Sequence, residues 1–95
     1  MQKTKKVIRY SENNISKYYL SPYVNISYRK GKVFIKQWLF AREISLECDE
    51  HLMLEFIKEI ENGLSFSSVI KELEKIFGAN AEVVLSILLK NGIIE

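Results

Sequence analysis

The stretch NAEVVLSILLKNG, from Asn80 to Gly92, decides the fold of this chain. It opens on a residue type that caps helices and closes on glycine, the usual left-handed stop, so it predicts a helix. Six of its residues are apolar: Val83, Val84, Leu85, Ile87, Leu88 and Leu89. At about 100° per residue they cover roughly 240° of the helix surface, far more than the stripe of about 100° that a surface helix needs. The surplus must be covered by the rest of the domain or by a partner.

Two more helices are predicted immediately before this one. Asp49 is the expected cap of a helix that runs to about Asn62 and ends at Gly63, and its apolar face consists of Leu52, Met53, Phe56, Ile57 and Ile60. Ser65 is the expected cap of the next helix, which ends at Gly78. Its predicted inward residues are Phe66, Val69, Ile70, Leu73, Ile76 and Phe77.

Three short strands are predicted ahead of the helices. Apolar residues alternate with polar ones from Tyr23 to Arg29 and again from Lys32 to Trp38, and Lys30-Gly31 supplies the turn of a β-hairpin. A third strand fits Arg42 to Cys48, with Ile44, Leu46 and Cys48 facing inward and Glu43, Ser45 and Glu47 facing outward. The predicted fold is therefore α+β and winged-helix-like, a three-stranded antiparallel sheet followed by three helices.

The chain divides into a basic leading segment, residues 1–22, and a single domain, residues 23–95. In the leading segment we predict a short strand at Val7, Ile8 and Tyr10, and packing of Ile15, Tyr18, Tyr19 and Leu20 on the domain. We expect its first residues to be mobile, as termini usually are. Pro22 separates the two parts.

Composition points to the cytoplasm. The one cysteine, Cys48, permits no internal disulfide. No secretory signal opens the chain, and no run approaches the roughly 18 apolar residues of a membrane span, so no membrane partner is expected. Residues 1–42 carry a charge of +9 and residues 43–95 a charge of −7. Either the two halves attract each other or the basic half binds something acidic.

Residues suited to catalysis are scarce. His51 has no further ligands at metal-binding spacing, and Cys48 alternates in phase with buried strand positions. Each glycine is assigned to a hairpin turn or to a helix end, so none remains for a phosphate-binding loop. We therefore expect no enzyme activity, no catalytic residue, no metal and no cofactor.

The strand layer and three glycine-punctuated helices resemble the RiPP recognition element, a PqqD-like winged-helix domain of peptide-modifying pathways. The resemblance covers roughly residues 20–95 and lies in four stretches: SPYVNISYRKGKVFI, EISLECDEHLMLEFIKEIENG, VIKELEKIFG and VVLSILLKNGII. The chain is also similar to the N-terminal region of dehydrogenases and cyclodehydratases that make thiazole-containing peptides.

The resemblance implies that the chain binds the leader of a ribosomally made precursor peptide. A separate or fused enzyme, such as a cyclodehydratase, dehydrogenase, cyclase or protease, then modifies that peptide in natural-product biosynthesis, including bacteriocin biosynthesis. The leader adds as a strand antiparallel to the third strand, and its side chains enter a groove against the last helix. The implied binding residues are Arg42, Glu43, Ile44, Ser45, Leu46, Glu47, Val83, Val84, Ile87 and Asn91.

The flank of the last helix that faces the strand is not determined by the sequence. If Val84, Leu85 and Leu88 face the core, then Val83 and Ile87 form one flank and Leu89 the other. We expect the Val83–Ile87–Asn91 side to line the groove.

Other functions remain open. Basic residues and aromatic side chains in the first half could stack on nucleic acid, and a hairpin with three helices also resembles a DNA-binding or regulatory winged helix. Nucleic acid is the less expected partner because the last helix carries a single lysine, Lys90. A dimerising subunit or an enzyme-docking module could use the same apolar strip. Alternatively, the leading segment could cover it.

Overall fold

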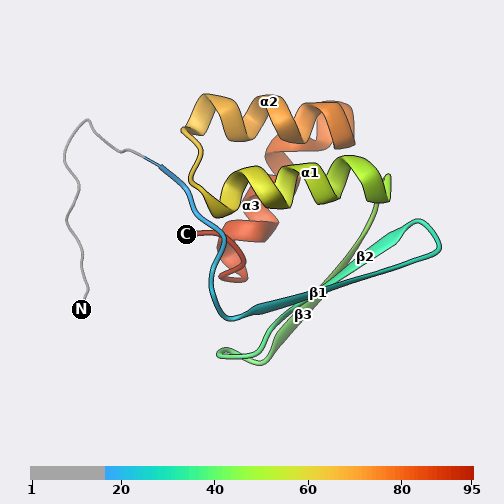
Figure 1. Ribbon diagram of the computed structural model, residues 1–95, viewed down its shortest axis with the longest axis vertical. Coiled ribbons are helices and arrows are strands. Elements are labelled where there is room, and N and C mark those ends of the chain that lie inside the picture. Colours follow the sequence, from blue (N-terminus) through green and yellow to red (C-terminus); the bar gives the residue numbers. More distant parts are fainter. Residues whose placement is uncertain (1–16) are drawn as a thin grey trace.

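A computed structural model describes residues 17–95 and contains a sheet and a layer of helices (Figure 1). The strands are β1 (Val24–Arg29), β2 (Lys32–Gln37) and β3 (Arg42–Glu47), and the helices are α1 (Glu50–Glu61), α2 (Phe66–Phe77) and α3 (Ala81–Lys90), with a 3-10 turn at Gly78–Asn80. The predicted α+β order is confirmed. The strand predicted at Val7, Ile8 and Tyr10 and the packing predicted for Ile15 lie outside the described residues.

The sheet is antiparallel with β2 in the centre, so β1 and β3 are its two edges. Lys30 and Gly31 both have positive φ, 49° and 79°, which is the conformation of the tight hairpin turn that suits the twist of two strands. The expected alternation is confirmed. The inward residues of β2 are buried, namely Val33, Ile35 and Gln37, whereas Ile44, Leu46 and Cys48 are half-buried.

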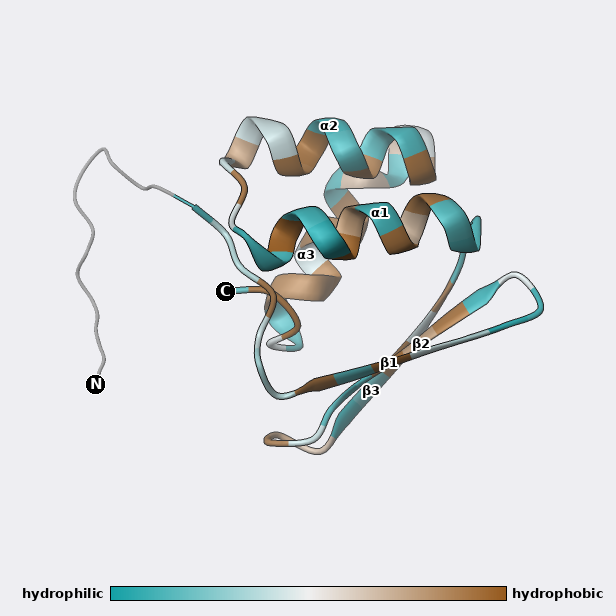
Figure 2. Ribbon diagram, in the orientation of Figure 1, coloured by the Kyte–Doolittle hydropathy of each residue, from teal (hydrophilic) through white to brown (hydrophobic). Residues whose placement is uncertain are grey.

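The helices lie on one side of the sheet, and apolar residues recur along α1 and α2 (Figure 2). Asp49 and Ser65 cap α1 and α2 as predicted, because their side chains accept from the amides of Leu52 and Ser68 at 3.0 and 3.3 Å. The core joins the sheet to the helices and consists of Val33, Ile35, Met53, Phe56, Ile60, Val69, Leu73, Ala81, Val84, Leu85, Leu88, Ile93 and Ile94.

Asn80 does not cap α3 through its side chain, contrary to the prediction. Its φ and ψ are −88° and 6°, and no side-chain hydrogen bond is made there. A capping side chain requires extended backbone, and here the preceding 3-10 turn leads directly into the helix. The position of the helix start is nevertheless as predicted.

The end of α3 is held against the beginning of the described chain. The amide of Ile93 donates to Leu88 (2.9 Å) and that of Gly92 to Leu89 (3.1 Å), the pair of bonds that closes a helix at a left-handed glycine. Tyr19 and Glu95 exchange two backbone bonds of 2.8 Å. Residues 17–21 are therefore part of the folded unit, although the sequence places them in the leading segment.

Two of the side chains expected to pack there do so. Tyr18 and Leu20 are partly buried against the core, and Leu20 forms an isolated bridge with Ile94. Tyr19 instead stays 45% exposed. Within residues 17–95, no helix combines the length and apolarity needed to cross a membrane.

Candidate functional site

The outer edge of β3 presents backbone groups that β2 does not use. The amide of Cys48 donates to the carbonyl of Gly31, so this position is one of the hydrogen-bonded pairs of the β2–β3 ladder. Such pairs alternate along an antiparallel ladder. The N–H and C=O groups of Glu43, Ser45 and Glu47 therefore point away from β2, and no other strand of residues 17–95 pairs with them.

The inner face of the same strand is apolar. Ile44 and Leu46 are half-buried and pack at the margin of the core. On the opposite, outer face of the sheet, a shallow hollow of about 320 Å³ is lined mainly by Phe34, Glu43 and Ser45, together with Ile44. An extended segment lying along β3 would thus meet polar backbone groups at its side and apolar side chains on its inner face.

One flank of α3 lies toward β3. The guanidinium of Arg42, the first residue of β3, donates to the side-chain oxygen of Asn91 at 3.5 Å. Helical periodicity places Val83 and Ile87 in line with Asn91. Val83 is 59% exposed and Ile87 is half-buried, so this flank adds accessible apolar surface on the side of the edge strand.

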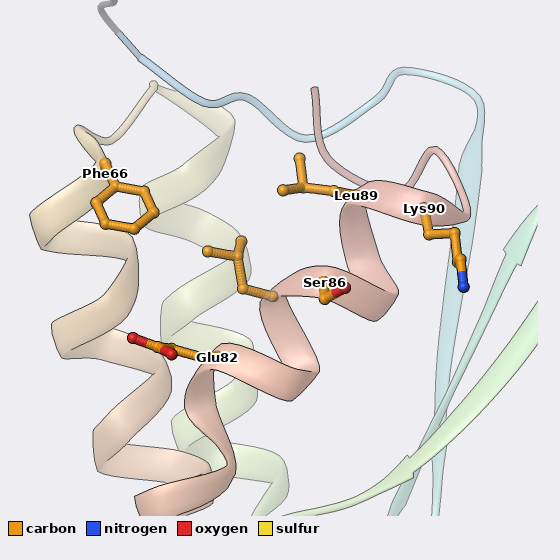
Figure 3. Close-up of a pocket in the computed structure, with 6 residues that line it drawn as sticks. Phe66, Glu82, Ser86, Leu89 and Lys90 are labelled. Atoms are coloured by element: carbon orange, nitrogen blue, oxygen red, sulfur yellow. The ribbon is translucent and has the colours of Figure 1, made fainter.

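The opposite flank of α3 faces α2 (Figure 3). A hollow of about 600 Å³ lies between the two helices, lined by Phe66, Glu82, Leu85, Ser86, Leu89 and Lys90. Phe66 was predicted to point inward, but it is 54% exposed because it begins α2, at the rim of the helix pair. No pattern in the sequence predicted this hollow.

Val84 is the one predicted binding residue that the structure removes from the surface. Its side chain is 5% exposed and belongs to the core, together with Leu85 and Leu88. The sequence shows which residues of α3 are apolar, but not which of them face the domain. That depends on how α3 packs against the other elements.

The buried side-chain amide of Gln37, which was not among the predicted site residues, connects the sheet to the end of α3. The Nε2 group of Gln37 donates to the carbonyl of Gly92 at 2.8 Å and to the hydroxyl of Ser21 at 3.3 Å, and its Oε1 accepts from the amide of Leu39 at 2.9 Å. These bonds join the end of β2 to the end of α3. Strand alternation was a usable signal, since Gln37 follows Val33 and Ile35 on the inward face.

Groups suited to covalent or metal chemistry are not gathered here. In the described part of the chain, no three His, Cys, Asp or Glu residues are placed to hold a metal ion. His51 lies on the exposed face of α1, with Nε2 3.4 Å from the carboxylate of Glu55. Burial, with a further contribution from Asp49, raises the pKa of the Cys48 thiol, which makes it a poorer nucleophile near neutral pH.

Comparison of the chain with protein-family models, curated proteins and solved structures found no match. The candidate site consists of a strand edge at β3 and the Val83–Ile87–Asn91 flank of α3, which meets the start of β3 where Asn91 accepts from Arg42.

Proposed function

We propose that this domain binds an extended peptide as an additional strand on β3, and that the peptide is the leader of a ribosomally made precursor. One observation supports this function most directly. The outward backbone groups of Glu43, Ser45 and Glu47 lie on the same side of the domain as the accessible apolar flank of α3.

The physical basis is strand addition. A peptide on an exposed sheet edge gains main-chain hydrogen bonds irrespective of its sequence, and pockets for alternate side chains supply specificity. Alternate peptide side chains would lie against Ile44 and Leu46 and extend toward Val83 and Ile87. Binding in the micromolar to nanomolar range would correspond to about −8 to −12 kcal/mol.

The resemblance to RiPP recognition elements supports a leader peptide as the ligand. On this proposal the domain acts in the cytoplasm and makes no covalent change itself. It holds the leader while a modifying enzyme, separate or fused, acts on the remainder of the precursor.

A second candidate, DNA binding by a winged helix, is supported by a different surface. Arg29, Lys30, Lys32 and Lys36 are exposed on the hairpin, and Arg29 lies 4.8 Å from the ring centre of Phe34. The candidate recognition helix, however, offers Glu82 and mostly apolar residues, where base readout needs polar and basic side chains. Peptide binding is therefore the better supported function.

The substitution Ser45→Pro tests the edge directly. Proline removes an N–H that points away from β2, so the β2–β3 ladder keeps its bonds while an added strand loses a donor. We expect affinity for the precursor leader, measured by calorimetry, to fall about tenfold or more, because a peptide carbonyl loses its partner.

Ser45→Ala is the matched control, since it removes the hydroxyl and keeps the N–H. It should bind as the parent does. Unchanged affinity in a folded Ser45→Pro variant would contradict strand addition at β3. Binding of duplex DNA that depends on Lys32 and Lys36, without any response to the leader, would favour the second candidate.

A further inference from the structure

The outer face of β3 carries two carboxylates at a regular spacing. Glu43 and Glu47 are exposed, and Ser45 lies between them on the same face. Across the ladder, Glu43 is opposite Lys36 and Glu47 is opposite Lys32. Within residues 17–95, neither carboxylate has a cationic partner within 4.0 Å.

These same residues are the ones whose backbone groups face the edge. In a strand added to β3, the residues that bond to them would project their side chains onto the outer face, directly beside those of Glu43, Ser45 and Glu47. The peptide residues between would face inward, opposite Ile44 and Leu46. Backbone direction and side-chain direction alternate together along a strand. The peptide residues that bond to the β3 backbone are therefore also the ones whose side chains lie beside Glu43 and Glu47.

We infer that Glu43 and Glu47 select a peptide with basic residues four positions apart and apolar residues at the alternate, inward positions. This inference rests on the proposed strand addition and names the class of peptide that fits it. Opposite charges facing each other across a ladder are stabilising, and like charges are destabilising. The spacing applies to a peptide antiparallel to β3, the orientation in which directly opposite residues exchange both backbone bonds and share a face.

A second copy of the chain is a poor occupant of this edge. Antiparallel pairing of two β3 strands about Ser45 would place Glu43 of each copy opposite Glu47 of the other. Two such like-charged pairs oppose association, which is a common protection of exposed edges. The carboxylates therefore discriminate against self-pairing while they favour a basic peptide.

The test uses two synthetic peptides that share inward leucine and valine residues and a central threonine. They differ at the two outward positions, which are lysine in one peptide and glutamate in the other. Binding to the full chain is measured by calorimetry, and amide shifts locate it at β3. We expect the lysine peptide to bind about tenfold more tightly at low salt, and the difference to shrink as salt screens the exposed charges.

The variant Glu43→Gln combined with Glu47→Gln should bind both peptides equally. Removing two carboxylates from α1 instead, with Glu59→Gln and Glu61→Gln, should leave the preference in place. Equal binding of the two peptides at β3 of the parent chain would overturn the charge selection and leave strand addition standing. Failure of both peptides and of the precursor leader to shift β3 would overturn strand addition as well.

Discussion

Gln37 is a polar side chain buried at the end of β2, where it joins three separate parts of the chain. It is 1% exposed, as is Ser21, and its amide bonds Ser21, Gly92 and Leu39. Buried polar groups are costly unless they are paired, so this network is both stabilising and selective for one arrangement. It holds the end of α3 at a fixed position relative to the end of β2.

Replacing this side chain with an apolar one of similar size tests the brace. Gln37→Leu leaves the carbonyl of Gly92 and the amide of Leu39 without their partner, which should lower the free energy of unfolding by about 1–3 kcal/mol. Urea denaturation measures the change. Lys36→Ala, on the exposed face next to it, should change stability by less than about 0.5 kcal/mol. Equal effects of the two substitutions would show that the amide network contributes nothing particular.

Cys48 and Tyr28 give the fold a dependence on alkaline pH. Burial is the main cause that raises the pKa of each, with Asp49 adding to the effect on the thiol and Cys48 and Glu50 to the effect on the phenol. A raised pKa means that the folded state holds the proton more tightly than the unfolded state. The resulting stability is present below the ordinary thiol pKa of 9.0 and is lost as pH rises past it.

We expect the free energy of unfolding to decrease as pH is raised from about 8 to above 10, and Cys48→Ser to flatten the first part of that decrease. Because the chain has one cysteine, its reaction with a thiol reagent reports on Cys48 alone. The folded protein should react more slowly at pH 8 than the urea-unfolded one. Equal rates would contradict the raised pKa.

At the scale of elements, hydrophobic periodicity, helix caps and terminal glycines predicted the fold well. The hairpin and the first two helices were predictable because alternation, side-chain caps and terminal glycines agree locally at Lys30-Gly31, Asp49 and Ser65. The predictions that failed depend on context. Asn80 follows a 3-10 turn instead of extended backbone, and the exposure of Phe66 reflects its place at the rim of the helix pair.

The candidate site was less predictable than the elements that form it. Sequence identified β3 as a strand and α3 as too apolar, but the covering of Val84 depends on how α3 sits on the domain. The proximity of Arg42 and Asn91 joins positions far apart in the chain and has no local signature. Likewise, the hollow beside Phe66 arises only when α2 and α3 are packed together.

The two flanks of α3 provide a matched pair of substitutions. Ile87→Glu places a charge on the flank toward β3 and should weaken leader binding about tenfold or more, because a charge resists burial beneath a peptide. Ser86→Glu places the same charge on the flank toward α2, at an exposed residue that lines the hollow beside Phe66, and should bind normally. Calorimetry with the leader compares them, once circular dichroism has verified that both fold. The reverse ranking would assign the peptide to the hollow lined by Phe66.

At the scale of the whole molecule, no salt bridge among residues 17–95 joins the basic first half to the acidic second half. Among the described residues, the two close pairs, His51–Glu55 and Lys75–Glu72, both lie within single helices. The two halves are joined instead by the β2–β3 ladder and the shared core. Backbone pairing of residues 17–21 with Leu64 and residues 93–95, and the Gln37 network, add to these connections. None of these contacts uses the outer edge of β3. The proposed function depends on this edge.

The most direct test of that function is a titration of the isotopically labelled protein with the leader of a precursor encoded beside its gene, followed amide by amide by NMR. Strand addition predicts shifts concentrated in β3, from Arg42 to Glu47, and along the Val83–Asn91 flank of α3. The amides of Glu43, Ser45 and Glu47 should also gain protection from exchange, since they acquire partners. Absence of shifts in β3 at a saturating leader concentration, or shifts confined to Lys30, Lys32 and Lys36 on adding duplex DNA, would contradict the proposal.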